Sequence, residues 1–210
     1  MAFTLHTNVL KDLVIKGIGT TYIDQAFEIG SAIFEKDKQE MLDKFDTHPI
    51  TEEIKEGPDA NNTSETLGGE GNLFSFIGFE RGSNPTVEVR DVLDNSTQIK
   101  KVGRGAKYNK SSVDYFFPIY LPLFDVELQN AAPMPWGTAR SWLKAIEEGI
   151  SGLNYYLFKR GEELKGSRSG PAIQLKGDKG AAFSSKIGSP QYKPIKYLSE
   201  ILNKFKAKYK

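Results

Sequence analysis

Residues 21–45, TYIDQAFEIGSAIFEKDKQEMLDKF, decide the fold. The stretch opens on Thr21-Tyr22-Ile23-Asp24, whose spacing matches a capping box with Asp in the Glu position. Apolar or small residues then recur at three- and four-residue steps, which places them on one side of a helix with most charges opposite. The residues on the apolar side are Ile23, Phe27, Gly30, Phe34, Met41 and Phe45. The pattern predicts a long amphipathic helix that must pack on other protein, with a shorter helical piece over residues 9–15 before it.

Two later segments repeat the helical spacing. Thr138 is placed as the N-cap of a central helix, and apolar residues follow it in a regular seam: Leu143, Ile146, Ile150, Leu153 and Leu157. The end of the chain has a second seam, surrounded by lysines: Ile195, Leu198, Leu202, Phe205 and Tyr209. This is a short basic amphipathic helix, which would dock on its own core, insert between neighbouring subunits or lie on a membrane surface. Docking on protein is the expectation.

Strands are predicted between these helices. Residues 73–79, LFSFIGF, are bulky on both faces and predict a central strand, and Asn84-Pro85 then starts a short helix that buries Val89, Val92 and Leu93. Residues 96–128 predict one or two further strands around a basic turn at 103–107. Pro118 and Pro122 remove ladder donors from the segment 113–124, which predicts an edge strand or extended arm. Such an edge either receives another chain or is shielded by its own protein.

Residues 47–72 break every periodic pattern. His48-Pro49, Gly57-Pro58, Asn61-Asn62 and Gly68-Gly69 are turn dipeptides, so an exposed loop is expected. A loop this long is uncommon unless it functions or is ordered by a partner. The chain therefore predicts an α+β fold in which the long N-terminal helix and the second central helix pack on a small, mainly antiparallel sheet, with long loops and a C-terminal amphipathic helix. Residues 1–158 would form the core domain, and residues 159–210 a basic Gly/Ser/Lys-rich extension docked on the core or on a neighbouring subunit.

The composition excludes several kinds of site. The 210 residues contain no cysteine, which excludes disulfides, thiolate zinc sites, iron–sulfur clusters and cysteine nucleophiles. The two histidines, His6 and His48, lack the setting of a general base or a metal pair. No run of about 18 apolar residues exists, and residues 1–20 lack the uninterrupted apolar stretch of a signal peptide. We expect no cofactor, no metal, no membrane contact, and assembly in the cytoplasm.

One enzymatic alternative remains, a metal-dependent nuclease. Its carboxylates would come from residues 52–59 and its cations from Lys176 or Lys179. The carboxylates are Glu52, Glu53, Glu56 and Asp59. Because nothing in their spacing requires them to converge on one ion, we expect a solvated loop face, no enzymatic activity, and an intact protein after Glu53→Ala.

Charge is segregated along the chain. Residues 159–210 hold 13 Lys or Arg against 4 Asp or Glu, whereas the whole protein has a net charge of +1. A basic end of this kind meets an acidic partner, either nucleic acid or a neighbouring protein, or simply keeps the protein soluble. A nucleic-acid-binding accessory protein is therefore the main alternative function.

Two stretches together resemble a known class of proteins. The string HPITEEIKEGPDANNTSETLGGEGNLFSFIGFERGSNP (48–85) is similar to a pattern in small virion proteins of tailed bacteriophages. So is MPWGTARSWLKAIEEGISGLNYYL (134–157), with SRSGPAIQ (167–174) beyond it. Those proteins act at the head–tail connector or as neck and tail-completion components. The resemblance implies an α+β subunit that forms a homo-oligomeric ring and joins the portal side to the tail, and it carries over no catalytic residue.

The residue pattern agrees with a joining role. Regular seams, a proline-marked edge and segregated charge all describe a chain with more adhesive surface than a monomer needs. The candidate interface residues are large aromatics, arginines and seam positions: Trp136, Arg140, Trp142, Arg168, Leu202 and Phe205. We expect a structural, non-enzymatic virion protein whose partners are copies of itself, neighbouring connector and tail proteins, and possible passing DNA.

Overall fold

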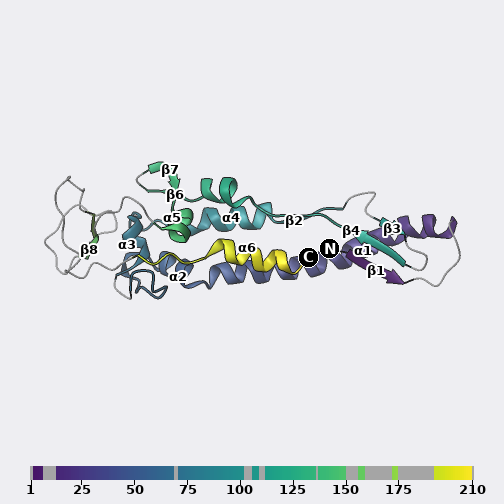
Figure 1. Cartoon of the computed structure of the whole chain (residues 1–210), viewed down its shortest axis with the longest axis horizontal. Coiled ribbons are helices and arrows are strands. Elements are labelled where there is room, and N and C mark those ends of the chain that lie inside the picture. The colour runs from purple at the N-terminus through teal and green to yellow at the C-terminus, as the bar shows by residue number, and fades with distance from the viewer. Residues whose placement is uncertain are drawn as a thin grey trace.

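The computed structural model describes residues 2–6, 13–68, 71–101, 106–108, 112–135, 137–149, 156–158, 172–174 and 192–209. Its longest element is helix α1 (Leu13–Asp46), whose 34 residues span about 50 Å at 1.5 Å per residue. The other helices are α2 (Pro49–Glu56), the 3₁₀ turn η1 (Gly57–Asp59), α3 (Leu73–Ile77), α4 (Thr86–Ser96), the π-helical η2 (Phe124–Leu128), α5 (Trp142–Glu148) and α6 (Leu198–Ala207). The described chain is elongated along α1 (Figure 1).

The strands are short, and all their pairings are antiparallel. A three-stranded sheet has the order β1-β4-β3, from β1 (Ala2–His6), β4 (Ser112–Phe116) and β3 (Ala106–Tyr108). Three two-stranded pairs accompany it: β2 (Gln98–Ile99) with β5 (Ile119–Tyr120), β6 (Pro133–Met134) with β7 (Gly137–Ser141), and β8 (Tyr156–Phe158) with β9 (Ala172–Gln174). The fold is therefore α+β, as the sequence predicts.

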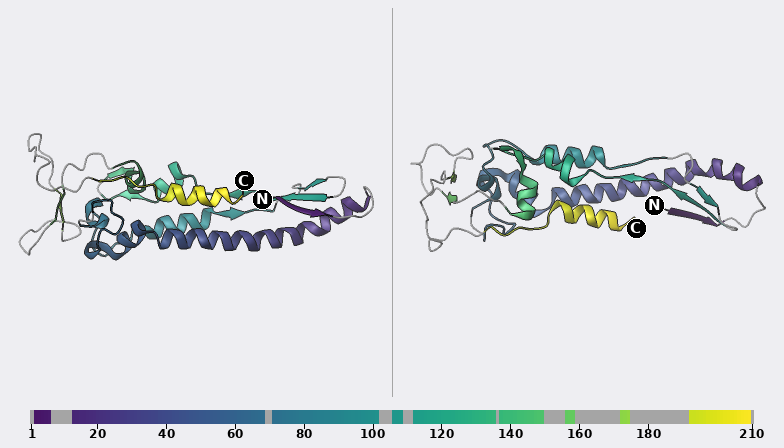
Figure 2. Two further views of the ribbon diagram at one scale, coloured as in Figure 1. Left: turned by 60° about the horizontal axis from the view of Figure 1, so that its bottom comes forward. Right: turned by 45° about the horizontal axis from the view of Figure 1, so that its top comes forward.

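Helices α4 and α6 both pack against helix α1. Figure 2 shows α4 and α6 running along the C-terminal half of α1, while the three-stranded sheet lies along its N-terminal half. The predicted apolar side of α1 is confirmed, because Phe34, Met41 and Phe45 are buried and join the main core. Nearer the N-terminus, the Phe27 ring packs edge-on against Phe117 at 5.2 Å between centroids. The predicted helices at α4 and α6 are also confirmed, with Val89, Leu93, Leu198, Leu202 and Phe205 buried.

The expected strand at residues 73–79 is wrong: the segment forms helix α3. The Asn72 side chain caps the helix by accepting a 2.8 Å hydrogen bond from Ser75 N, and Gly78 ends it in the left-handed region at φ 86°. All five α3 residues are buried. A short apolar run is buried on every side in either conformation, so only the flanking cap residues distinguish the helix from a strand.

The expected exposed loop at 47–72 is also wrong. Residues 49–59 are helical, and Ile50, Ile54 and Leu67 are fully buried. The carboxylate of Glu53, fully buried on α2, organises the turns that follow. It accepts hydrogen bonds from Leu73 N (2.6 Å), Ser64 Oγ (2.6 Å), Ser64 N (3.2 Å) and Asn62 Nδ2 (2.9 Å). The segment is thus folded around a buried acid, which corrects the expectation of a solvated face at this residue.

The central helix is shorter than expected. Residues 137–141 form strand β7, so Thr138 lies in a strand and not at an N-cap, and α5 begins at Trp142. Gly149, at φ 103°, ends the helix after Glu148 and donates its N–H to Ala145 O at 2.9 Å. Leu143 and Ile146 are buried as the seam predicts, but Leu157 belongs to β8. Ile150 and Leu153 lie outside the described residues.

The segment 113–124, which contains Pro118 and Pro122, does not form a single edge strand. Strand β4 pairs with β1 on one side and β3 on the other, so it is central in its sheet. Pro118 and Pro122 flank β5, where their missing donors cost no ladder hydrogen bond. Only β5 has the expected edge character, because β2 is its one partner among the described strands. The basic turn expected at 103–107 lies mostly outside the described residues.

We predict that Glu53→Ala destabilises the protein by about 3 kcal/mol, because it leaves several buried donors without their acceptor; this replaces the expectation from the sequence that the variant stays intact. Urea unfolding followed by circular dichroism measures this change. The matched control is Glu52→Ala, an exposed neighbour that should shift the free energy of unfolding by less than about 0.5 kcal/mol. Equal unfolding midpoints for the two variants would show that the buried carboxylate does not organise residues 57–73.

Candidate functional site

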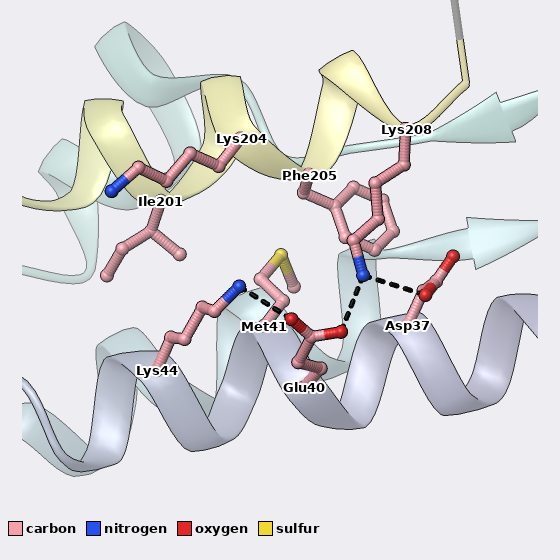
Figure 3. Close-up of a pocket in the computed structure, with 8 residues that line it drawn as sticks. All are labelled: Asp37, Glu40, Met41, Lys44, Ile201, Lys204, Phe205 and Lys208. Carbon is pink, nitrogen blue, oxygen red and sulfur yellow. Dashed lines mark hydrogen bonds and ion pairs between the residues drawn. The ribbon is translucent and has the colours of Figure 1, made fainter.

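The groove between α1 and α6 is lined by both apolar and charged side chains (Figure 3). Lys208 Nζ lies 2.8 Å from Asp37 Oδ1 and 2.6 Å from Glu40 Oε2, and Tyr209 donates to Asp37 Oδ2 at 2.7 Å. Beneath these contacts the Phe205 ring packs edge-on against Phe34, with centroids 6.1 Å apart. The charged contacts therefore hold the last turn of α6 over an apolar seam.

The ionised forms of the carboxylates in this groove stabilise the docking of α6 on α1. Burial acts to raise the pKa of Asp37, but the hydrogen bonds from Lys208 and Tyr209 outweigh it and leave that pKa below its usual value. Hydrogen bonds from Lys208 and Lys44 lower the pKa of Glu40 from 4.5 to about 2. Because both pKa values are depressed in the folded state, the stabilisation is complete above about pH 4.5 and is lost as the pH falls towards 2.

The start of α6 is capped from another helix. The buried Glu147 of α5 accepts hydrogen bonds from Ser199 N (2.8 Å) and Tyr197 N (3.3 Å) through Oε1. A negative charge at a helix N-terminus stabilises the first turn, where backbone N–H groups lack helical partners. The fully buried Tyr197 stacks on Phe45 at 5.9 Å and shares a hydrogen bond with Thr51. Helices α1, α2 and α5 thus all fix the entry of the chain into α6.

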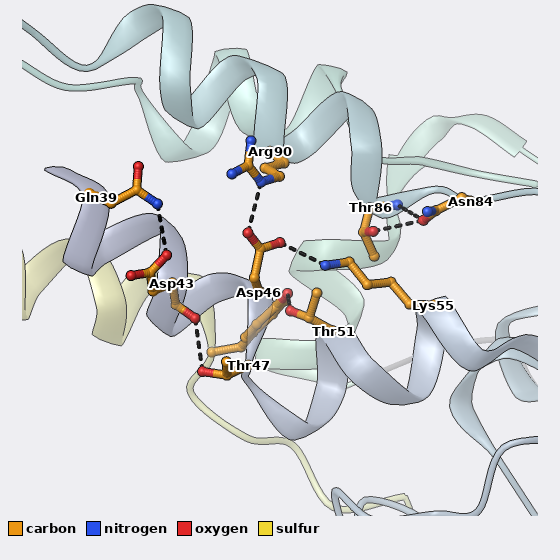
Figure 4. A network of polar contacts seen from close by, with 10 residues as sticks. Gln39, Asp43, Asp46, Thr47, Thr51, Lys55, Asn84, Thr86 and Arg90 are labelled. Carbon is orange, nitrogen blue, oxygen red and sulfur yellow. Dashed lines mark hydrogen bonds and ion pairs between the residues drawn. The ribbon is translucent and has the colours of Figure 1, made fainter.

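A polar network joins α1, α2 and α4 on the other side of α1 (Figure 4). The carboxylate of Asp46 bridges Lys55 Nζ at 2.7 Å and Arg90 Nε at 2.8 Å. Burial acts to raise the pKa of Asp46, but Lys55 and Arg90 outweigh it and lower that pKa. These contacts fix the relative positions of three helices, because both cations pair with the one carboxylate of Asp46.

His48 occupies a half-buried position between α2 and α6. Its Nδ1 accepts a 3.2 Å hydrogen bond from Ile50 N, which makes it the N-cap of α2, and its ring lies 4.6 Å from the Tyr197 ring. Burial lowers the pKa of His48; Lys204 also lowers it, whereas Glu200 opposes the shift. Capping requires an unprotonated Nδ1, so the neutral ring is the form that the fold uses.

The carboxylates of the nuclease alternative do not form a common site. Glu53 is buried among its donors, whereas Glu52, Glu56 and Asp59 are exposed. Within the described residues, no group of three or more His, Cys, Asp or Glu side chains is arranged to hold a metal ion. In that same part of the chain, no helix combines the length and the apolar character needed to cross a bilayer.

The candidate interface residues lie in three different settings. Trp142, Leu202 and Phe205 are buried in this chain's own core, at 1–3% exposure. Arg140 is exposed on β7. Trp136 and Arg168 lie outside the described residues. The structure therefore gives the three apolar residues a packing role within the chain and does not bring them together with Arg140.

Other large apolar residues are exposed among the described residues: six lie on two surfaces, and Val87 and Phe116 lie outside both. The sequence analysis missed the first surface, whereas Tyr120 and Leu123 of the second fall in the segment 113–124 that it expected to be an edge strand or arm. The first, the α1 stripe, consists of Tyr22, Ile29 and Ile33, exposed by 39%, 58% and 43%. The second, the η2 patch, consists of Tyr120, Leu123 and Val126, exposed by 50%, 63% and 53%. Spacings of 7 and 4 residues place the α1 stripe on one side of the helix. The spacing of Tyr22, Ile29 and Ile33 is visible in the sequence, beside the longer apolar seam that includes Phe27, Phe34 and Met41.

Comparison with models of protein families, with curated proteins and with solved structures found no match to this chain. The functional interpretation therefore depends on the geometry of these surfaces and on the sequence patterns.

We predict that protonation of His48 weakens the fold as the pH falls below about 6.5. The folded-state pKa is depressed, so the unfolded chain takes up the proton first and stability is lost as the pH falls. Thermal melts at pH 7.5 to 5 (about half-unit steps) measure the effect, whose slope cannot exceed about 1.4 kcal/mol per pH unit for one proton. His48→Asn keeps a capping side chain but cannot titrate, so its melting temperature should fall less over this range. Parallel curves for the two proteins would contradict the assignment.

We predict that Phe205→Ala costs about 3–5 kcal/mol of stability, because the ring is buried against α1. Lys208→Ala should cost much less, since its ion pairs are partly exposed and screened. Guanidinium unfolding of both variants provides the comparison. A larger loss in Lys208→Ala would mean that charge, and not apolar packing, holds α6 in place.

Proposed function

We propose that this protein is a structural subunit of a tailed-bacteriophage virion. It assembles with copies of itself into a ring at the neck or tail-completion region, where the ring joins the portal side to the tail. The proposal includes no enzymatic step. Its partners are its own copies and the adjoining connector and tail proteins, and its location is the virion, assembled in the host cytoplasm.

The observation that carries the proposal is the exposed apolar surface. Six large apolar side chains lie exposed on the α1 stripe and the η2 patch, outside the core that the described residues form. Exposed apolar groups gathered in this way mark surfaces that other protein covers. The elongated shape in Figure 1 offers long flanks for lateral contact between subunits. The resemblance of residues 48–85 and 134–157 to phage neck proteins supplies the biological setting.

A second candidate, binding of nucleic acid, has one observation in its favour. Lys193 and Lys206 of the C-terminal segment are exposed, whereas Lys196 lies 4.0 Å from the buried Glu147 and Lys204 pairs with Glu200 of the same helix. These charges belong to the basic segment 159–210. In a neck ring they would face passing DNA, whereas in an accessory protein they would themselves be the binding site.

We predict that the purified protein assembles into species of several chains and that added salt does not dissociate them. Apolar contacts are not screened, whereas phosphate contacts weaken with a slope of roughly −0.9 in log K per contact against log salt. Light scattering at about 0.1 M and about 0.5 M NaCl measures the mass, and DNA retention is measured in the same buffers. Labelled antibody on virus particles tests the neck location.

The control variant is Lys193→Gln/Lys206→Gln, which removes charge but no apolar surface. Its assembled fraction should equal that of the parent protein. A protein that stays monomeric at every concentration and binds DNA with a steep salt dependence would contradict the ring and favour the accessory-protein alternative.

A further inference from the structure

We infer that His48 is a proton-sensitive switch that couples the starts of two helices, α2 and α6. In its neutral form the ring caps α2 and lies against Tyr197, the N-cap residue of α6. A proton on the ring shifts both helix starts towards an open state, while the far end of α6 stays docked on α1. This inference does not depend on the proposed ring.

At α2, the switch acts through one hydrogen bond. Pro49 has no N–H to donate, so the N–H of Ile50 is the first one in the helix, and it donates to His48 Nδ1 at 3.2 Å. Once protonated, Nδ1 carries a hydrogen and faces this N–H as a second donor, so the cap is lost. The bond from Glu52 N to His48 O at 3.0 Å does not involve the ring. Protonation therefore removes the cap but leaves the rest of the first turn in place.

At α6, the switch acts through Tyr197. The His48 ring lies 4.6 Å from the Tyr197 ring, which is fully buried, stacks on Phe45 and shares a hydrogen bond with Thr51 of α2. Backbone N–H groups give the start of a helix a partial positive charge. The carboxylate of Glu147, which accepts from Ser199 N at 2.8 Å, has the sign that such a position favours. An imidazolium at His48 has the opposite sign and lies at the start of two helices at once.

The charged groups around the ring favour its neutral form. Burial lowers the pKa of His48; Lys204 also lowers it, and together they outweigh Glu200, which raises it. Glu200 and Lys204 pair with each other at 2.6 Å, so each weakens the effect of the other. The other charged groups on the elements packed here are Asp43, Lys44 and Asp46 on α1, Glu52 and Lys55 on α2, and Glu147 on α5. All of these except the exposed Glu52 have a partner of their own.

The two ends of α6 respond in different pH ranges. At the last turn Lys208 binds Asp37 and Glu40, and the pKa of Glu40 is about 2. At the first turn His48 titrates from about 6.5 when open to a lower pKa when docked. Opening is therefore favoured as the pH falls below about 6.5, by at most about tenfold per pH unit for one proton. Between pH values of about 6.5 and about 4.5, α6 opens from its start and remains held at its end.

Hydrogen exchange of the full chain, followed by mass spectrometry between about pH 7.5 and about pH 5, tests this coupling. Labelling times are scaled to the intrinsic exchange rate at each pH. We expect residues 49–56 and 198–207 to lose protection together below about pH 6.5, and residues 86–96 of α4 to keep theirs. His6→Gln should respond like the parent protein, because the chain has only two histidines. His48→Asn caps without titrating, so neither helix should respond in that variant.

Two exposed neighbours provide a matched pair of variants. Glu200→Gln removes the anion that favours the protonated ring and should move the response to lower pH, whereas Lys204→Gln should move it to higher pH. A general weakening of α6 would instead move both variants in the same direction. The inference is overturned if α2 responds without α6, if neither helix responds, if α4 loses protection equally, or if the response persists in His48→Asn.

Discussion

The carboxylate of Glu53 is the constraint on which the rest of the fold depends. It is fully buried and lies among hydrogen-bond donors. A buried charge is tolerated only where hydrogen bonds replace its water, and here Leu73, Ser64 and Asn62 supply the donors. Because those donors come from residues 62–73, the acid fixes the path of a segment that has little regular structure. Helix α3 starts from that path, and its buried side chains complete the core.

A second constraint is the length of α1. Its C-terminal half is covered by α4 and α6, which bury Phe34, Met41 and Phe45. Its N-terminal half packs mainly on the small three-stranded sheet, through the contact of Phe27 with Phe117. A helix of this length gains most of its stability from packing, so a flank without cover is costly unless function requires it. The exposed Ile29 and Ile33 lie on that flank.

Periodicity predicted the elements with many helical turns and failed for the short ones. The apolar sides of α1 and α6 were evident because each repeats over several turns, which outweighs local propensity. Helix α3 is only five residues long, and its identity depends on the caps Asn72 and Gly78. The role of Glu53 could not be predicted, because its donors lie 9 to 20 residues away and converge only in the folded chain. The candidate interface residues could not be placed from the sequence for the same reason. Trp142, Leu202 and Phe205 were chosen by residue type and seam position, and the fold buries all three in the core.

One physical requirement relates the internal packing to the proposed assembly. Apolar positions on a helix are stabilising only when something removes them from water. Along α1, helix α6 satisfies this requirement at Phe34, whose ring packs on Phe205, whereas Ile33 and Ile29 remain exposed. A neighbouring chain that supplied the missing cover would therefore extend, across the subunit boundary, the kind of packing that already holds α6 in place.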